Sequence, residues 1–155
     1  MEFCYTLPLR RRLNRKPSTS QTVTAPFFCW DVHTLTVQRR KAVLAMNCAS
    51  RYSLLLYGMN GADWVRLPEL VRDEIRAVIL REGLSEFEAT RYFVLGGPLS
   101  ISAAHGLKST AAHIINGEVY HAKKSRGVLP DGISASVRSR MEGFFDDFQH
   151  AVFSR

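Results

Sequence analysis

The alternation of apolar and polar residues predicts three consecutive β-strands in the first third of the chain. These strands are expected at residues 27–37, 42–46 and 51–57. Within the first, a period of two places Trp30, Val32 and Thr34 on one face and Asp31, His33 and Leu35 on the other. The connections QRRK (38–41) and NCAS (47–50) are short, so the three strands should form an antiparallel meander.

A second pattern, with apolar residues three and four positions apart, predicts an amphipathic helix after the meander. Its apolar stripe consists of Leu67, Leu70, Val71, Ile75, Val78 and Ile79. Pro68 suits the first turn of this helix, and Gly83 suits its end. The stripe can be buried against the meander, which predicts an α+β fold with an antiparallel sheet packed against helices.

The remaining elements are predicted from shorter signals. Strands are expected at residues 2–6 and 99–103, a helix start near Pro8, and a loop at 17–26. Residues 85–95 fit a helix or a strand equally well, and residues 109–117 read as a helix. We divide the chain into an α+β domain, residues 1–132, and a C-terminal amphipathic helix, residues 133–155.

The C-terminal helix carries an apolar stripe that must be covered. The stripe consists of Val137, Met141, Phe144, Phe145, Phe148 and Val152. Burying one such side chain stabilises a fold by roughly 1.5–3 kcal/mol, so leaving the whole stripe in water would be costly. Two arrangements remain open: the helix packs on its own domain, or it pairs with a second copy or another protein.

Composition adds limits to this picture. The chain has 155 residues, and no apolar run approaches the length of a membrane span, so we expect a cytoplasmic protein. Cys4, Cys29 and Cys48 are widely spaced in apolar stretches and form no CxxC pair. We expect them to be small buried side chains in a reducing compartment, with no metal site and no cofactor.

Charge is distributed unevenly. The net charge is +7, and residues 1–41 contribute eight cations against two anions. Residues 108–126 contribute four cations against one anion. A basic protein with two such segments favours a polyanion as partner, nucleic acid above all, although a basic protein without such a partner fits the composition as well.

Three groups of residues are the candidate anion-binding sites. Arg39, Arg40 and Lys41 occupy a predicted turn that contains none of the usual turn residues Gly, Asn, Asp or Pro. Lys108 and Ser109 precede a predicted helix, whose first N–H groups would attract an anion. The third group, a second basic arm, consists of Lys123, Lys124 and Arg126.

Known catalytic patterns are absent from the sequence. The stretch GLKST lacks the glycine spacing of a phosphate-binding loop. His105, His113 and His121 recur every eight residues, too far apart on a helix to bind one metal ion. No arrangement of nucleophile and base can be assigned, so we predict no catalytic residue.

The segment CWDVHTLTVQRRKAVLAMNCASRYSLLLYGMNGADWVRLPEL resembles a bacterial family described as domain of unknown function 6933. The resemblance rests on Trp30, Arg39, Arg40, Lys41, Asn47, Tyr52, Ser53, Leu56, Gly58, Asp63 and Leu67, and more weakly on Lys108, Ser109 and Asn116. It covers roughly residues 1–117. Lys108 departs from it, standing where the family pattern has arginine. The resemblance implies one architecture for the two blocks and no activity.

The sequence thus favours a small binding protein that contacts nucleic-acid phosphates. The alternative is a protein-interaction or oligomerising subunit, for example of a bacterial defence or toxin–antitoxin system, that uses its C-terminal helix. A third reading is an enzyme for a phosphorylated substrate, with His105 or His113 as the acid or base.

Overall fold

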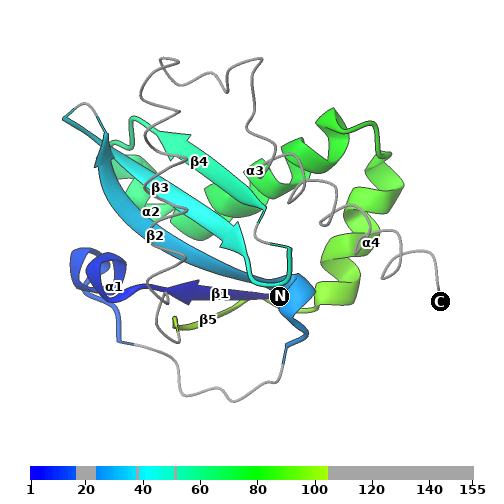
Figure 1. Ribbon diagram of the computed structural model, residues 1–155, viewed down its shortest axis with the longest axis horizontal. Helices are drawn as coiled ribbons and strands as arrows, with labels where there is room; N and C mark the ends of the chain where they lie inside the picture. Colours follow the sequence, from blue (N-terminus) through cyan, green and yellow to red (C-terminus); the bar gives the residue numbers. More distant parts are fainter. Residues whose placement is uncertain (17–23, 38, 51, 105–155) are drawn as a thin grey trace.

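The fold is built on one five-stranded mixed β-sheet. A computed structural model describes residues 1–16, 24–37, 39–50 and 52–104 of the chain. The strands are β1 (Glu2–Tyr5), β2 (Cys29–Val37), β3 (Arg40–Asn47), β4 (Ser53–Tyr57) and β5 (Ser100–Ala103). They lie side by side in the order β4-β3-β2-β1-β5 (Figure 1).

The predicted meander is confirmed in strands β2, β3 and β4. Both of its strand pairs are antiparallel, with Trp30 opposite Asn47 and Met46 opposite Ser53. The apolar run that predicted a central strand is buried on both faces of the sheet, from Ala42 to Asn47.

The sheet as a whole is not antiparallel, and here the sequence-based prediction was wrong. β1 lies between β2 and β5 and runs parallel to both. Parallel neighbours cannot be joined by a tight turn and need a crossover. Residues 6–28 supply the crossover from β1 to β2. The connection from β4 to β5 contains three helices. The sheet is mixed because β1 and β5 extend the antiparallel meander on the β2 side with parallel strands.

Four α-helices and one 3-10 turn complete the described fold. They are α1 (Leu7–Leu13), the 3-10 turn η1 (Pro26–Phe28), α2 (Gly61–Val65), α3 (Leu67–Arg81) and α4 (Glu86–Gly96). α3 matches the helix predicted from the apolar stripe, with Pro68 in its first turn. The ambiguous segment is the helix α4. It begins with a capping box, in which Ser85 accepts from the Glu88 N–H and Glu88 accepts from the Ser85 N–H.

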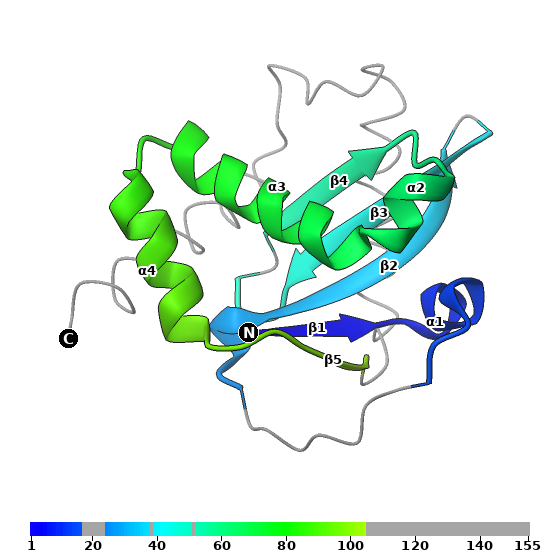
Figure 2. The same ribbon diagram turned by 180° about the vertical axis from the view of Figure 1, so that it is seen from behind.

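The helix α3 lies across one face of the sheet, with α2 at one end and α4 at the other (Figure 2). The core between the two layers contains Phe3, Tyr5, Trp30, Val32, Val43 and Ala45 from the sheet and Leu67, Val71, Ile75 and Ile79 from α3. Trp30 and Val32 lie on the same face of β2 and point into this core, as the period of two predicted. A helix layer on a sheet therefore confirms the α+β class.

A buried hydrogen-bond network joins the sheet to α4 at one end of the core. Trp30 Nε1 donates to the Tyr92 hydroxyl (3.0 Å), which in turn donates to the Phe27 carbonyl (2.9 Å). Asn47 Nδ2 donates to the same carbonyl (2.8 Å). Its Oδ1 accepts from the N–H groups of Ala49 and Ser50, which fixes the turn between β3 and β4.

The domain boundary at residue 132 and the C-terminal helix at 133–155 lie outside the described residues. Within the described part of the chain, no helix is long and apolar enough to span a bilayer.

Candidate nucleic-acid interface

The first candidate group lies at the tip of the hairpin between β2 and β3. Val37 pairs with Arg40, so the loop consists of residues 38 and 39 alone, and the four-residue turn predicted at 38–41 is too long. Arg40 and Lys41 instead begin β3, on opposite faces of the strand. All three cations, Arg39, Arg40 and Lys41, are exposed to solvent.

Arg39 adopts a left-handed backbone conformation, with φ of +65°. Two-residue hairpin loops need positive φ, which Gly, Asn or Asp adopt most easily. An ordinary L-residue pays roughly 1–2 kcal/mol for this conformation. The chain thus carries a long cation at a position where a glycine would be favoured.

Lys41 is held in place by a neutral neighbour. Its Nζ donates to the hydroxyl of Thr36, the residue opposite it on β2, at 2.8 Å. Since the acceptor is uncharged, the contact orients the ammonium group without neutralising it. The tip of the hairpin therefore presents its full positive charge to solvent.

A second basic group lies on α1 and was missed as a site from the sequence. The residues are Arg10, Arg11 and Arg12 in its last turn, followed by Arg15 and Lys16. Leu9 is buried and anchors the helix, while Asn14 ends it in a left-handed conformation. Cations in a last turn also interact favourably with the helix dipole.

The parallel pairing of β1 with β2 brings the two basic groups to one end of the sheet. α1 follows the carboxyl end of β1, and the hairpin tip follows the carboxyl end of β2. The carboxyl ends of parallel strands lie at the same end of a sheet, so both groups lie at that end, on the left in Figure 1. The signal LRRRLNRK was visible in the sequence, but its position required the parallel pairing.

A third segment joins this end through α2. The guanidinium of Arg12 lies over the Trp64 ring, 4.1 Å from its centroid, which ties α1 to α2. The exposed Arg66 follows directly. We call this surface the basic end; it consists of Arg10, Arg11, Arg12, Arg15, Lys16, Arg39, Arg40, Lys41 and Arg66.

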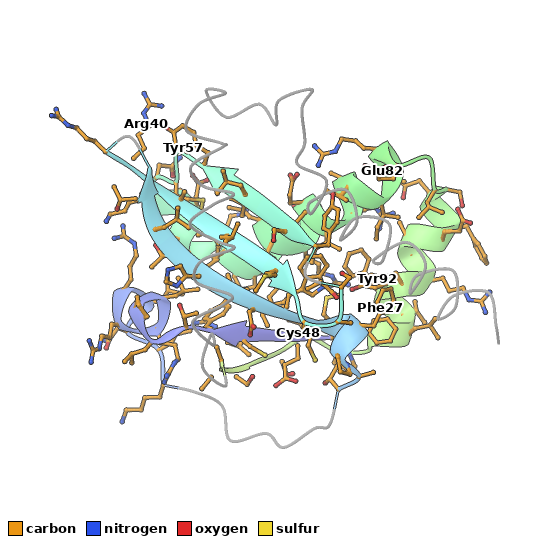
Figure 3. All side chains as sticks on the ribbon, in the orientation of Figure 1. Phe27, Arg40, Cys48, Tyr57, Glu82 and Tyr92 are labelled. Atoms are coloured by element: carbon orange, nitrogen blue, oxygen red, sulfur yellow. The ribbon has the colours of Figure 1, made fainter. Side chains whose placement is uncertain are left out.

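Few anions oppose the basic end. Asp63 and Glu69 are the acidic residues of the segments that form it, and Asp63 is engaged in the capping box of α2 with Asn60. Two ion pairs of the described residues lie away from the basic end: Arg76–Glu86 joins α3 to α4, and Arg81–Glu74 lies within α3. Figure 3 shows the separation, with Arg40 at one end of the sheet and Glu82 at the other.

The other predicted anion-binding residues cannot be placed against this surface. Lys108, Ser109, Lys123, Lys124 and Arg126 lie outside the described residues, as do His105 and His113. The structure therefore places Arg39, Arg40 and Lys41 at the same end of the sheet as α1 and Arg66, and the second basic arm stays a prediction.

Two further features have a chemistry of their own. A shallow cavity of about 410 Å³ lies between α3 and α4, lined by Glu69, Arg72, Asp73, Arg76, Thr90, Phe93 and Val94. Its charges are mixed, and Arg72 lies over the Phe93 ring at 4.9 Å. A mixed lining of this kind does not select for a polyanion.

The cysteines are the second feature. Cys4 and Cys29 are buried and Cys48 is half-buried, all as free thiols. Cys29 Sγ donates to Glu2 Oε2 at 3.7 Å, and burial raises the pKa of Cys29 to about 12. Among the described residues, no group of three or more His, Cys, Asp or Glu side chains is arranged to hold a metal ion.

The comparisons with known proteins bear on the family of the chain. No curated protein and no solved structure matches it. A family model with the description "Domain of unknown function (DUF6933)" matches residues 2–116, a span that contains the whole described sheet, its helices and the basic end. The chain therefore belongs to the DUF6933 family.

Proposed function

We propose that the protein binds nucleic acid by contacting backbone phosphates with its basic end. The observation that carries the proposal is the convergence of nine cations from three separate segments on one end of the sheet, opposed by Asp63 and Glu69. A surface of this charge attracts a polyanion over the distance of a Debye length, roughly 8–10 Å.

The conformation of Arg39 supports the same reading. A backbone conformation that an arginine adopts only at a cost is a reason to look for a function of its side chain. At the tip of a hairpin, that side chain projects beyond the sheet and can reach a phosphate group that the flat strands cannot.

Contacts of this type position a nucleic acid without reading its sequence. Arginine suits them, because its planar guanidinium donates to two phosphate oxygens at once. We therefore expect binding that depends strongly on salt and weakly on base sequence.

A salt titration tests the proposal. Binding of fluorescently labelled single- and double-stranded oligonucleotides of mixed sequence is measured by anisotropy at several salt concentrations. If about five of the nine cations contact phosphates, log K should fall with log salt with a slope of about −3.5 to −4.5. An affinity that is undetectable at low salt, or independent of salt, would contradict the proposal.

Charge reversal locates the contacts on the surface. We expect the combined variant Arg39→Glu, Arg40→Glu, Lys41→Glu to lower the affinity and the salt slope, since it removes three phosphate contacts. A matched control reverses Arg76, Arg81 and Arg91 on α3 and α4, with the same change in net charge. Equal losses in the two variants would show that net charge, and not the basic end, governs binding.

A second candidate function is protein interaction, favoured by the exposed apolar side chains of α4. Phe87 and Val94 are each 71% exposed and lie two turns apart on the helix. Val94 also lines the cavity between α3 and α4. The combined variant Phe87→Ser, Val94→Ser tests this role, because it should abolish any concentration-dependent association measured by sedimentation while leaving nucleic-acid binding unchanged.

A further inference from the structure

Tyr57 is an aromatic residue that the fold leaves in contact with solvent. It ends β4, an edge strand of the sheet, and 38% of its surface is exposed. Among the described residues, the other exposed aromatic residue is Phe87 on α4, a helix that lies at the opposite end of α3 from α2 (Figure 2). The position of Tyr57 in the sheet decides which side chains lie beside its ring.

The strand register places Arg40 beside Tyr57. Tyr57 pairs with Ala42 on β3, and the Gly58 N–H donates to the Lys41 carbonyl at 3.1 Å. Arg40 is the next residue toward the hairpin tip, so it is the diagonal neighbour of Tyr57, at a separation that aromatic and long side chains can bridge. Figure 3 shows Arg40 and Tyr57 next to each other at the same end of the sheet, so Tyr57 lies at the basic end.

Tyr57 and Arg40 also share one face of the sheet. Val43 and Leu56 belong to the core under α3, and side chains alternate along a strand, so Tyr57 and Arg40 face away from that helix. At Gly58, with φ of +76°, the chain leaves β4 toward α2. The ring of Tyr57 therefore lies at the end of the outer face of an edge strand, with a cation as its neighbour.

Trp64, a second aromatic residue at the basic end, is already covered. It is half-buried, and the Arg12 guanidinium lies over its ring, 4.1 Å from the centroid. The cation–aromatic contacts of the described residues involve the rings of Trp64 and Phe93 and do not include Tyr57. The phenol ring of Tyr57 therefore offers a bound molecule a surface that the indole ring of Trp64 does not.

An exposed ring beside a cation suits an unpaired base. The flat face of any base stacks on an aromatic side chain, while a neighbouring cation contacts the phosphate. In a duplex the bases are paired and stacked on one another, so their faces are not available for this contact. Phosphate contacts are open to single and double strands alike, and the ring of Tyr57 adds an interaction that only an unpaired base can make.

We propose that Tyr57 stacks on a base of a single-stranded nucleic acid while Arg40 binds an adjacent phosphate. The inference rests on the proposed function and narrows it from nucleic acid in general to single strands. Stacking of this kind tolerates any base, so it agrees with binding that depends weakly on base sequence.

The test compares two single-stranded oligomers that carry the same phosphates. One is oligothymidylate of about 12 nucleotides, within the usual size of a single-strand site. The other has the same length and an abasic sugar at every position. Binding of each to the 155-residue chain is measured by anisotropy at one low salt concentration. The variants are Tyr57→Leu, which removes the ring, Tyr57→Phe, which keeps it, and Phe87→Leu, a matched control at the exposed ring on α4.

The wild type should bind oligothymidylate at least about fivefold more tightly than the abasic oligomer, the value of one stacked base. Tyr57→Leu should bind the two oligomers equally, with its affinity for the abasic oligomer unchanged, because the phosphate contacts remain. Tyr57→Phe and Phe87→Leu should keep the wild-type preference. A duplex of the same length should bind equally to the wild type and to Tyr57→Leu, since it offers no unpaired base.

Other results overturn the stacking site. Equal binding of the two oligomers by the wild type means that the bases make no contact, and the phosphate contacts of the proposed function would still stand. A preference that Tyr57→Leu retains places the stacked base on another residue. A preference that Phe87→Leu loses as fully as Tyr57→Leu means that the contact is not specific to the basic end. If neither oligomer nor the duplex binds, the proposed function falls and the stacking site falls with it.

Discussion

At the scale of single residues, Asn47 shows how one buried amide can hold two parts of a fold. Its side chain is fully buried and bonds the Phe27 carbonyl on one side and the N–H groups of Ala49 and Ser50 on the other. The sequence placed this residue at the edge of a turn, which is correct. Its partners, 20 residues away at Phe27, could not be predicted because they depend on the pairing of β2 with β3.

Replacing Asn47 should therefore be strongly destabilising. We expect Asn47→Ala to lower the free energy of unfolding by about 2–4 kcal/mol, because it leaves two backbone N–H groups without their acceptor. Urea denaturation measures the loss. The exposed cap Asn60→Ala is the control, with an expected loss of about 1 kcal/mol. Equal losses at the two positions would show that the buried network adds nothing.

Arg39 allows stability and binding to be separated at a single position. Arg39→Gly should raise the free energy of unfolding by up to about 1 kcal/mol, because glycine adopts positive φ without strain. The same variant should weaken nucleic-acid binding, since it removes a cation. Arg40→Gly removes the same charge from extended β3 and should lower stability instead; a loss of stability in both variants would contradict this assignment.

At the scale of secondary-structure elements, local patterns predicted what local physics determines. α3 and the meander were predicted because their apolar periods are long and their partners are adjacent in sequence. β1 and β5 were expected as strands, yet their parallel pairing was not. It joins Glu2 to Ser100, and no turn chemistry records a contact across that separation. The basic end was predicted only in part for the same reason. The hairpin cations were identified as a site, but the arginines of α1 were not, because their position depends on the parallel pairing of β1 with β2.

Residues 85–95, which fitted a helix or a strand in the sequence, begin with Ser85, and this residue favours the helix. Ser85 caps α4 in a reciprocal capping box with Glu88, a signal that its apolar pattern obscured. We expect Ser85→Ala to lower the free energy of unfolding by about 1 kcal/mol, while Ser85→Asp, which keeps an acceptor, stays within a few tenths. Thermal or urea unfolding distinguishes them, and identical behaviour of the two variants would show that the cap does not contribute.

At the scale of the whole molecule, buried phenols and thiols set the response to alkaline pH. Burial raises the pKa of Tyr5 to about 12, and it also raises the pKa of Tyr52 and Tyr92. A tyrosine titrates near 10 in the unfolded chain, so the folded state binds its proton more tightly. The stabilisation is complete below pH 10 and is lost as the pH rises toward the folded pKa.

We therefore expect stability to fall between about pH 10 and 12, with an onset near pH 9 from Cys29, whose pKa is raised in the same way. Tyr5→Phe should reduce the loss between pH 10 and 12 by about 2 kcal/mol, because phenylalanine has no proton to release. Urea denaturation across this pH range measures the effect. A slope for Tyr5→Phe equal to that of the exposed control Tyr57→Phe would contradict it.

The place of β1 in the sheet also governs how the chain can fold. As an interior strand it needs neighbours on both sides, and its two partners begin 27 and 98 residues further along, since Glu2 pairs with Cys29 and with Ser100. The chain loses loop-closure entropy over the longer of these separations before the pairing of β1 with β5 contributes any stabilisation. During synthesis, β1 leaves the ribosome before β2 and β5, and one of its edges stays unpaired until β5 has emerged. Folding should accordingly be slow for a domain of this size, and this unpaired edge of β1 is the place where a nascent chain is most exposed to pairing with the wrong strand.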